Sequence, residues 1–114
     1  MKKQSYSYII MIKDSKGNKY LKVGKTNNIN KRKHQYKADG YTIIKIYNIF
    51  TFRSEKLALA FEDFLRDYFI QKYDGKNYVK WDRFLNGYAS KKDLKALCNL
   101  YQKFYSDLYN SPLC

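Results

Sequence analysis

Four side chains in the first third of the chain have types and spacings that suit chemistry on a phosphodiester. Tyr8 and Lys22 lie in two strand-like segments, and a hairpin that turns near residue 15 would place them opposite each other. Arg32 and Tyr36 are four residues apart, so a helix would make them neighbours. A guanidinium binds phosphate in a fork geometry, and a phenol or an amine can transfer a proton. These residue types therefore point to phosphate chemistry.

A carboxylate adds to this set. Glu62 lies beside the apolar stripe of a predicted helix, three residues before Leu65, where we expect it to be half-buried. Each of these residues also has an ordinary interpretation. A strand tyrosine is usually part of the core, a helical Arg–Tyr pair is usually at the surface, and a glutamate beside a stripe is usually solvated. Residue type alone leaves both interpretations open.

Other catalytic and metal-binding patterns are missing from the sequence. The chain has one histidine and two cysteines, without CxxC or Cys/His spacing and without a glycine-rich phosphate loop. We therefore interpret His34 as a surface residue near nucleic acid, outside the catalytic set. Cys98 lies on an apolar helix stripe, where we expect it to pack, and both Cys98 and Cys114 are expected to be reduced thiols.

The positive charge of the chain is concentrated near its start. The formal net charge is +13; residues 1–40 hold 11 basic and 2 acidic side chains, whereas residues 41–114 hold 12 and 8. This balance indicates a polyanionic partner, nucleic acid first of all. No apolar run reaches the roughly 18 residues of a membrane span, and no signal-sequence pattern is present. We expect an intracellular protein, cytoplasmic or in the nucleoid or nucleus, that is not secreted and has no membrane partner.

The elements that must position these residues follow from composition and periodicity. Three segments rich in β-branched and aromatic residues are predicted strands: 5–12, 20–25 and 41–50. Three segments with capping residues and helical spacing are predicted helices: 29–39, 55–73 and one that starts after Ser90 and stops at Pro112. The segment 74–88 is predicted to be irregular. The order predicts an α+β fold, a small three-stranded antiparallel sheet flanked by helices (ββαβα) with one extra C-terminal helix.

That last helix is amphipathic. Ser90 and Asp93 form a capping-box-like start. The apolar stripe then keeps helical spacing through Leu94, Leu97, Cys98, Tyr101, Phe104, Tyr105 and Leu108. Residues 89–114 therefore either pack on the rest of the domain or supply the face of a homodimer.

The hairpin and the following helix resemble the GIY-YIG nuclease family. In "YSYII", Tyr8 stands where the family has the tyrosine of GIY. In "KVGKT", Gly24 keeps the glycine of YIG, and Lys22 replaces its tyrosine, a variation known in some branches of the family. Arg32 follows Gly24 by eight residues and Tyr36 follows Arg32 by four, as the family pattern requires.

The resemblance extends over residues 5 to about 80, which places a nuclease domain at 1–88. Glu62, on the helix after the third strand, matches the metal-binding glutamate, and Asn77 follows it by fifteen residues, as an asparagine of the family does. One departure is that Tyr6 and Ser7 replace the Gly and Ile of GIY. The resemblance implies a metal-dependent DNA endonuclease that holds one Mg²⁺ or Mn²⁺ ion through Glu62.

The resemblance also implies a role for each residue. Arg32 would bind the scissile phosphate, Tyr36 would orient water or the phosphate, and Asn77 would brace the site. Tyr8 is the favoured general base, with its pKa lowered by Lys22 across the hairpin, and Lys22 is the other candidate base. Thr26 and Gly24 would shape the turn.

Substrate recognition is less defined. The side chains expected to contact the DNA backbone are Lys25, Lys31, Lys33, His34 and Lys37. Trp81 and Tyr78 could stack on an unpaired base, although we expect Trp81 to anchor its loop to the core. We expect the DNA partner to be a duplex or a branched, structured DNA. Two alternatives remain: a catalytically silent nucleic-acid-binding module of the same fold, and a protein-interaction domain with incidental lysines.

Overall fold

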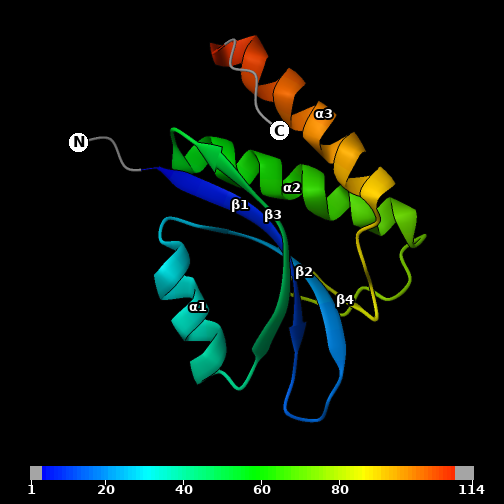
Figure 1. Cartoon of the computed structure of the whole chain (residues 1–114). Coiled ribbons are helices and arrows are strands. Elements are labelled where there is room, and N and C mark those ends of the chain that lie inside the picture. The colour runs from blue at the N-terminus through cyan, green and yellow to red at the C-terminus, as the bar shows by residue number, and fades with distance from the viewer. Residues whose placement is uncertain (1–3, 110–114) are drawn as a thin grey trace.

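The fold is α+β, as predicted (Figure 1). The computed structural model describes the backbone of residues 4–109 and the side chains of residues 4–103. The elements follow one another as β1 (Ser5–Lys13), β2 (Lys19–Thr26), α1 (Ile29–Ala38), β3 (Thr42–Phe52), α2 (Glu55–Lys72), β4 (Arg83–Leu85) and α3 (Lys91–Tyr109). None of these helices combines the length and the apolarity that a bilayer crossing requires, within the described residues.

The sheet has four antiparallel strands in the order β3-β1-β2-β4, so the predicted count of three is wrong. The additional strand, β4, has three residues and lies in the segment that we predicted to be irregular. A strand this short carries too few side chains to show the alternation that identifies strands in a sequence. It pairs with the outer edge of β2, opposite Lys22 and Leu21.

The hairpin register differs from the predicted one. Tyr8 pairs with Gly24, and Lys22 pairs with Ile10, so Tyr8 and Lys22 share a face of the sheet but are not opposite each other. The turn is centred on residue 16 and not on residue 15, since Lys13 pairs with Lys19. Asp14 closes it: its backbone N–H donates to the carbonyl of Asn18 at 3.0 Å, and its carboxylate accepts from the Asn18 N–H at 2.9 Å.

The sheet separates two cores of different size. The larger core lies between the sheet and the α2–α3 side, and its biggest fully buried side chains include Phe50, Phe52, Phe61, Phe69 and Phe84. The smaller core lies on the opposite face, against α1, and consists of Tyr8, Ile10, Ile12 and Tyr36 with partly buried neighbours. Figure 1 shows α1 on one side of the sheet and α2 with α3 on the other. The predicted site residues Tyr8 and Tyr36 thus belong to the smaller core.

The predicted helix starts are confirmed. The side chain of Asn28 accepts from the N–H of Lys31 at 3.0 Å at the start of α1, and Ser54 caps α2. At α3, Ser90 and Asp93 each accept from the other's backbone N–H, at 3.1 and 2.9 Å, which is a reciprocal capping box.

The described part of α3 packs on the domain. Leu97 and Tyr101 are buried in the larger core, and Leu94 and Cys98 pack against it. A homodimer through this helix stays a prediction. The remaining stripe positions and the predicted end of the helix lie outside the described side chains or backbone: Phe104, Tyr105, Leu108, Pro112 and Cys114.

Candidate active site

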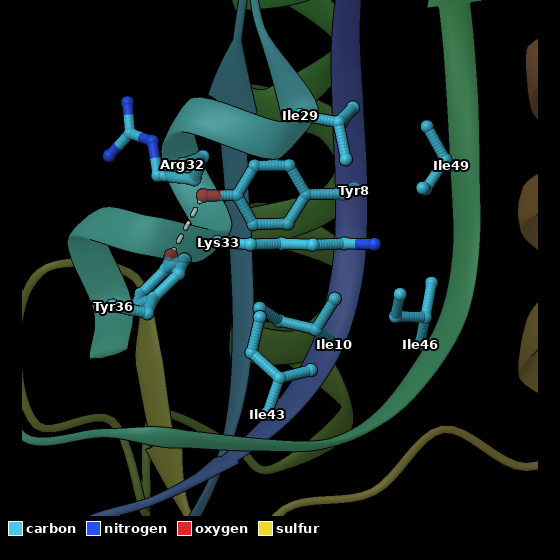
Figure 2. A pocket seen from close by; sticks show the side chains of 9 residues that line it. All are labelled: Tyr8, Ile10, Ile29, Arg32, Lys33, Tyr36, Ile43, Ile46 and Ile49. Carbon is cyan, nitrogen blue, oxygen red and sulfur yellow. Dashed lines mark hydrogen bonds between the residues drawn. The ribbon is translucent and has the colours of Figure 1, made fainter.

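The small core holds a buried pair of phenols. Tyr8 on β1 and Tyr36 on α1 share a hydrogen bond of 2.7 Å between their hydroxyl oxygens, with the rings edge to face (Figure 2). The ring of Tyr8 covers Gly24 on β2, where an added β-carbon would overlap the phenol. Gly24 is therefore required by the close approach of Tyr8. Isoleucines from α1, β1 and β3 line the pocket beside this pair.

Arg32 lies one helical turn before Tyr36, as predicted. One of its guanidinium nitrogens, Nη2, donates to the carbonyl of Lys25 at 3.3 Å. Its Nε is buried and has no hydrogen-bond partner within the described residues. Figure 2 shows the guanidinium turned away from the isoleucines of the pocket. A buried donor without an acceptor is costly, so this arrangement suits an acceptor supplied by a ligand.

Lys22 is a partly buried amine at the edge of this cluster. Its Nζ donates to the carbonyl of Val23 at 2.7 Å. Burial lowers the pKa of Lys22 to about 8, and the charges of Asp82 and Glu62 oppose this effect in part. A lysine with such a pKa is neutral in a substantial fraction of molecules in slightly basic solution, so it can accept a proton.

The predicted lowering of the Tyr8 pKa is wrong in direction. Burial raises the pKa of Tyr8 above its ordinary value, and the opposing hydrogen bond from Tyr36 and charge of Arg32 do not reverse this. Burial likewise holds the pKa of Tyr36 well above its usual range. Both phenols are therefore neutral at physiological pH. They act as hydrogen-bonding groups, and the phenolate expected at Tyr8 is not favoured.

Glu62 is half-buried on α2, as predicted, and it has a second carboxyl beside it. Burial, the charge of Asp82 and a hydrogen bond with Asp82 together raise the pKa of Glu62 to about 7. The charges of Glu62 and Asp82 also influence the pKa values of Lys22 and Tyr8. The carboxyl pair thus lies close enough to the lysine and the buried phenols to influence their pKa values.

Asp82 is a site residue that sequence reasoning missed. It precedes β4, and its carbonyl accepts from the N–H of Val23 on β2 at 3.1 Å, which fixes it against the strand that carries Lys22. Arg66 on α2 lies 3.8 Å from its carboxylate. The one feature of the sequence that could indicate a role for Asp82 is its position next to Trp81 in a loop with several basic residues. Without β4 in the prediction, nothing placed that loop near Glu62.

The family described as the T5orf172 domain matches residues 5–107. The chain belongs to this family. No curated protein and no solved structure matches the chain. Membership in the T5orf172 domain family indicates a nucleic-acid-related function, in agreement with the net charge of +13.

The side chains at two further predicted positions of this T5orf172 domain do not join the cluster. Asn77 is exposed in the segment between α2 and β4, with a left-handed backbone (φ 65°), and its carbonyl accepts from the N–H of Leu85 at 2.7 Å. In the described part of the chain, no hydrogen bond joins its side chain to Glu62. Lys25, predicted to contact DNA, forms an ion pair with Glu55 at 2.6 Å.

The remaining predicted DNA contacts of the T5orf172 domain are exposed on α1: Lys31, Lys33, His34 and Lys37. They flank Arg32 and Tyr36 on the same helix, so the basic surface adjoins the cluster. Trp81 does not anchor its loop, contrary to expectation, because 70% of its surface is exposed. Trp81 directly precedes Asp82 in the chain.

Proposed function

We propose that the chain is a metal-dependent DNA endonuclease of the GIY-YIG type. The observation that carries this proposal is the convergence of Tyr8, Lys22, Arg32, Tyr36 and Glu62 from four elements, β1, β2, α1 and α2. Five of the six residues that the resemblance selects as catalytic are thus electrostatically connected. A basic surface beside them supports a polyanionic substrate, and the family supports nucleic acid.

In this proposal Arg32 binds the scissile phosphate. Its buried Nε has no acceptor within the described residues, and a phosphate oxygen would supply one. An arginine can make two parallel hydrogen bonds to a phosphate, which fixes the orientation of the phosphorus for attack in line with the leaving oxygen. The exposed lysines of α1 would hold the neighbouring backbone phosphates without reading the sequence.

The carboxyl pair fits a divalent cation. Within residues 4–103 no group of three or more acidic, histidine or cysteine side chains is suited to hold a metal alone. Mg²⁺ and Mn²⁺ accept such a site, because they bind through one or two carboxylates and fill their remaining positions with water and phosphate oxygens. Glu62 would hold the ion, with Asp82 beside it, and both carboxyls would then be ionised. The bound ion would neutralise phosphate charge and make its water more acidic.

Lys22 is the general base in this proposal. The identity of the base was open between Tyr8 and Lys22, and the raised pKa of Tyr8 argues against a phenolate. Lys22, with a pKa near 8, can take a proton from the attacking water as a neutral amine. Tyr8 and Tyr36 would then orient water and phosphate through their hydroxyls. Asn77 is not needed for any of these steps.

The first test is nicking of supercoiled plasmid with Mg²⁺, Mn²⁺ or EDTA. Glu62→Gln and Arg32→Lys are expected to lose cleavage, since the first removes the metal ligand and the second removes the fork geometry. Asp67→Asn is the matched control, because Asp67 lies on α2 and its side chain is 63% exposed. Cleavage that survives EDTA or Glu62→Gln would refute the metal site. DNA binding that weakens steeply with salt, without cleavage of any DNA form, would instead assign a catalytically silent binding module.

A further inference from the structure

Trp81 is presented at the tip of a narrow, well-fixed turn. The N–H of Val79 donates to the carbonyl of Arg83 at 2.8 Å, and the N–H of Leu85 donates to that of Asn77 at 2.7 Å. Tyr78 and Phe84 form a bridge between these bonds, with ring centroids 5.3 Å apart. The turn is therefore held in place by backbone hydrogen bonds and packing while the indole remains in water.

The backbone at this tip is unusual. Trp81 and the following Asp82 both have φ of 56°, in the left-handed region that bulky residues rarely adopt. The bond from Val23 to the carbonyl of Asp82 ties the tip to β2, so the strained conformation is supported from outside the turn. Strain of this kind persists where surrounding contacts enforce it, and it is concentrated at functional sites. Here it turns the Asp82 carboxyl toward Glu62 and leaves the indole exposed.

The charges around the tip match a nucleic acid strand. Lys76 and Lys80 are exposed in the same segment, and Arg83 follows Asp82. Consecutive Cα atoms lie about 3.8 Å apart, so the backbone of Trp81 lies beside that of Asp82, one member of the carboxyl pair that would serve the scissile phosphate. A strand bound at that phosphate would therefore bring an adjacent base to Trp81.

We propose that Trp81 is a stacking platform for an unpaired nucleobase next to the scissile phosphate. This inference rests on the proposed nuclease site and names its substrate class. Inside a duplex, both faces of each base are covered by its neighbours in the stack, so an indole can stack only on a base that is unpaired, bulged or terminal. The preferred substrate is therefore DNA with an unpaired base at the cleavage position, such as a bulge or a branch.

The chain contains one tryptophan, so its fluorescence reports on this position alone. The experiment uses the full chain with Glu62→Gln, which prevents cleavage, and two probes: a blunt duplex, and the same duplex with one unpaired adenine. Both probes have the same ends, on which an indole can also stack, so quenching is expected to be stronger with the bulged probe than with the blunt duplex. In a competition assay, Trp81→Ala is expected to bind the bulged probe roughly tenfold more weakly and the blunt duplex equally well.

Two further variants sharpen the test. Trp81→Phe is expected to retain most of the preference, because phenylalanine also stacks. Tyr88→Ala is the matched control, since Tyr88 is 55% exposed and lies outside the tip; it is expected to leave both affinities unchanged. Equal affinity for the two probes, or a parallel loss on both with Trp81→Ala, would overturn the stacking role and leave the nuclease proposal standing. No binding of either probe at low salt would overturn the nuclease proposal itself.

Discussion

Tyr8 and Gly24 are direct partners across the β1–β2 pair, and the phenol of Tyr8 occupies the space that a side chain at position 24 would need. An added β-carbon would overlap the hydroxyl end of the ring and lie 3.0 Å from its Cε1. Position 24 therefore requires glycine for a steric reason, because the Tyr8 ring fills the space of a β-carbon there. The glycine and the buried phenol pair form one structural unit.

We expect Gly24→Ala to destabilise the fold by about 1–3 kcal/mol, because the Tyr8 ring must leave its position over β2. Urea denaturation measures this loss. In a Tyr8→Ala background the ring is absent, so the same substitution should cost much less, and a double-mutant cycle gives the coupling. An equal cost in both backgrounds would show that the methyl group meets something else.

The two phenols should be coupled as well. Tyr36→Phe leaves the Tyr8 hydroxyl, in a side chain that is 3% exposed, without the 2.7 Å partner, so we expect a loss of about 1–3 kcal/mol. Replacing both hydroxyls removes the unpaired group, and Tyr8→Phe/Tyr36→Phe should be more stable than the sum of the single variants predicts. Urea midpoints of the four proteins test this. Strictly additive effects would mean that the bond contributes nothing specific.

The proposed base predicts a pH dependence of cleavage. The neutral amine of Lys22 is the active form, so the rate should rise with pH and level off above about 8, the pKa of Lys22. Arginine stays protonated throughout, so Lys22→Arg should lower the rate by at least roughly a hundredfold. Lys31→Arg, on exposed α1, serves as the control. An unchanged pH profile in Lys22→Arg would remove Lys22 from the role of base.

Asp93 predicts an acid-sensitive contribution to stability. Burial alone would raise its pKa, but hydrogen bonds from Lys72, Ser90 and Tyr68 lower the pKa from 3.8 to about 2. A carboxyl with a depressed folded-state pKa stabilises the fold fully above the unfolded value and loses this contribution as the pH falls toward 2. The wild type should thus lose about 1–2 kcal/mol more than Asp93→Asn in this window.

This prediction is checked by urea denaturation between pH 2 and pH 6. Asp67→Asn, at an exposed position of α2, should follow the wild type at every pH. If the difference between the wild type and Asp93→Asn does not shrink as the solution becomes more acidic, the ion pair with Lys72 at 2.5 Å does not stabilise the fold.

The parts of the site that depend on local periodicity were predictable from the sequence. Arg32 and Tyr36 are neighbours because a helix brings together residues four apart, and Glu62 is half-buried because it borders an apolar stripe. The pairing of Tyr8 depends on the position of the turn, and an error of one residue at its centre moves the partner of Lys22 from Tyr8 to Ile10.

The positions of Asp82 and Trp81 could not be predicted from sequence periodicity. Their placement depends on left-handed backbone at two consecutive residues without glycine, and on a three-residue strand that pairs with β2. Neither feature has a sequence pattern of its own, because both are stabilised by contacts with distant segments. The predicted lowering of the Tyr8 pKa is wrong for a related reason. Burial raises this pKa by more than nearby positive charge lowers it, and the extent of burial follows from the assembled core.

All residues of α1 belong to the described part of the chain, and among them Tyr36 is the one that is buried. The helix that carries the basic surface is therefore attached to the sheet through Tyr36, with the partly buried Ile29 and Arg32 beside it. Its exposed positions can change with little cost in stability, so the proposed preference for particular DNA substrates can diverge among descendants of this protein through α1 while the scaffold is retained. Tyr36, Tyr8 and Gly24 pack on one another, so we expect these three residues to stay unchanged.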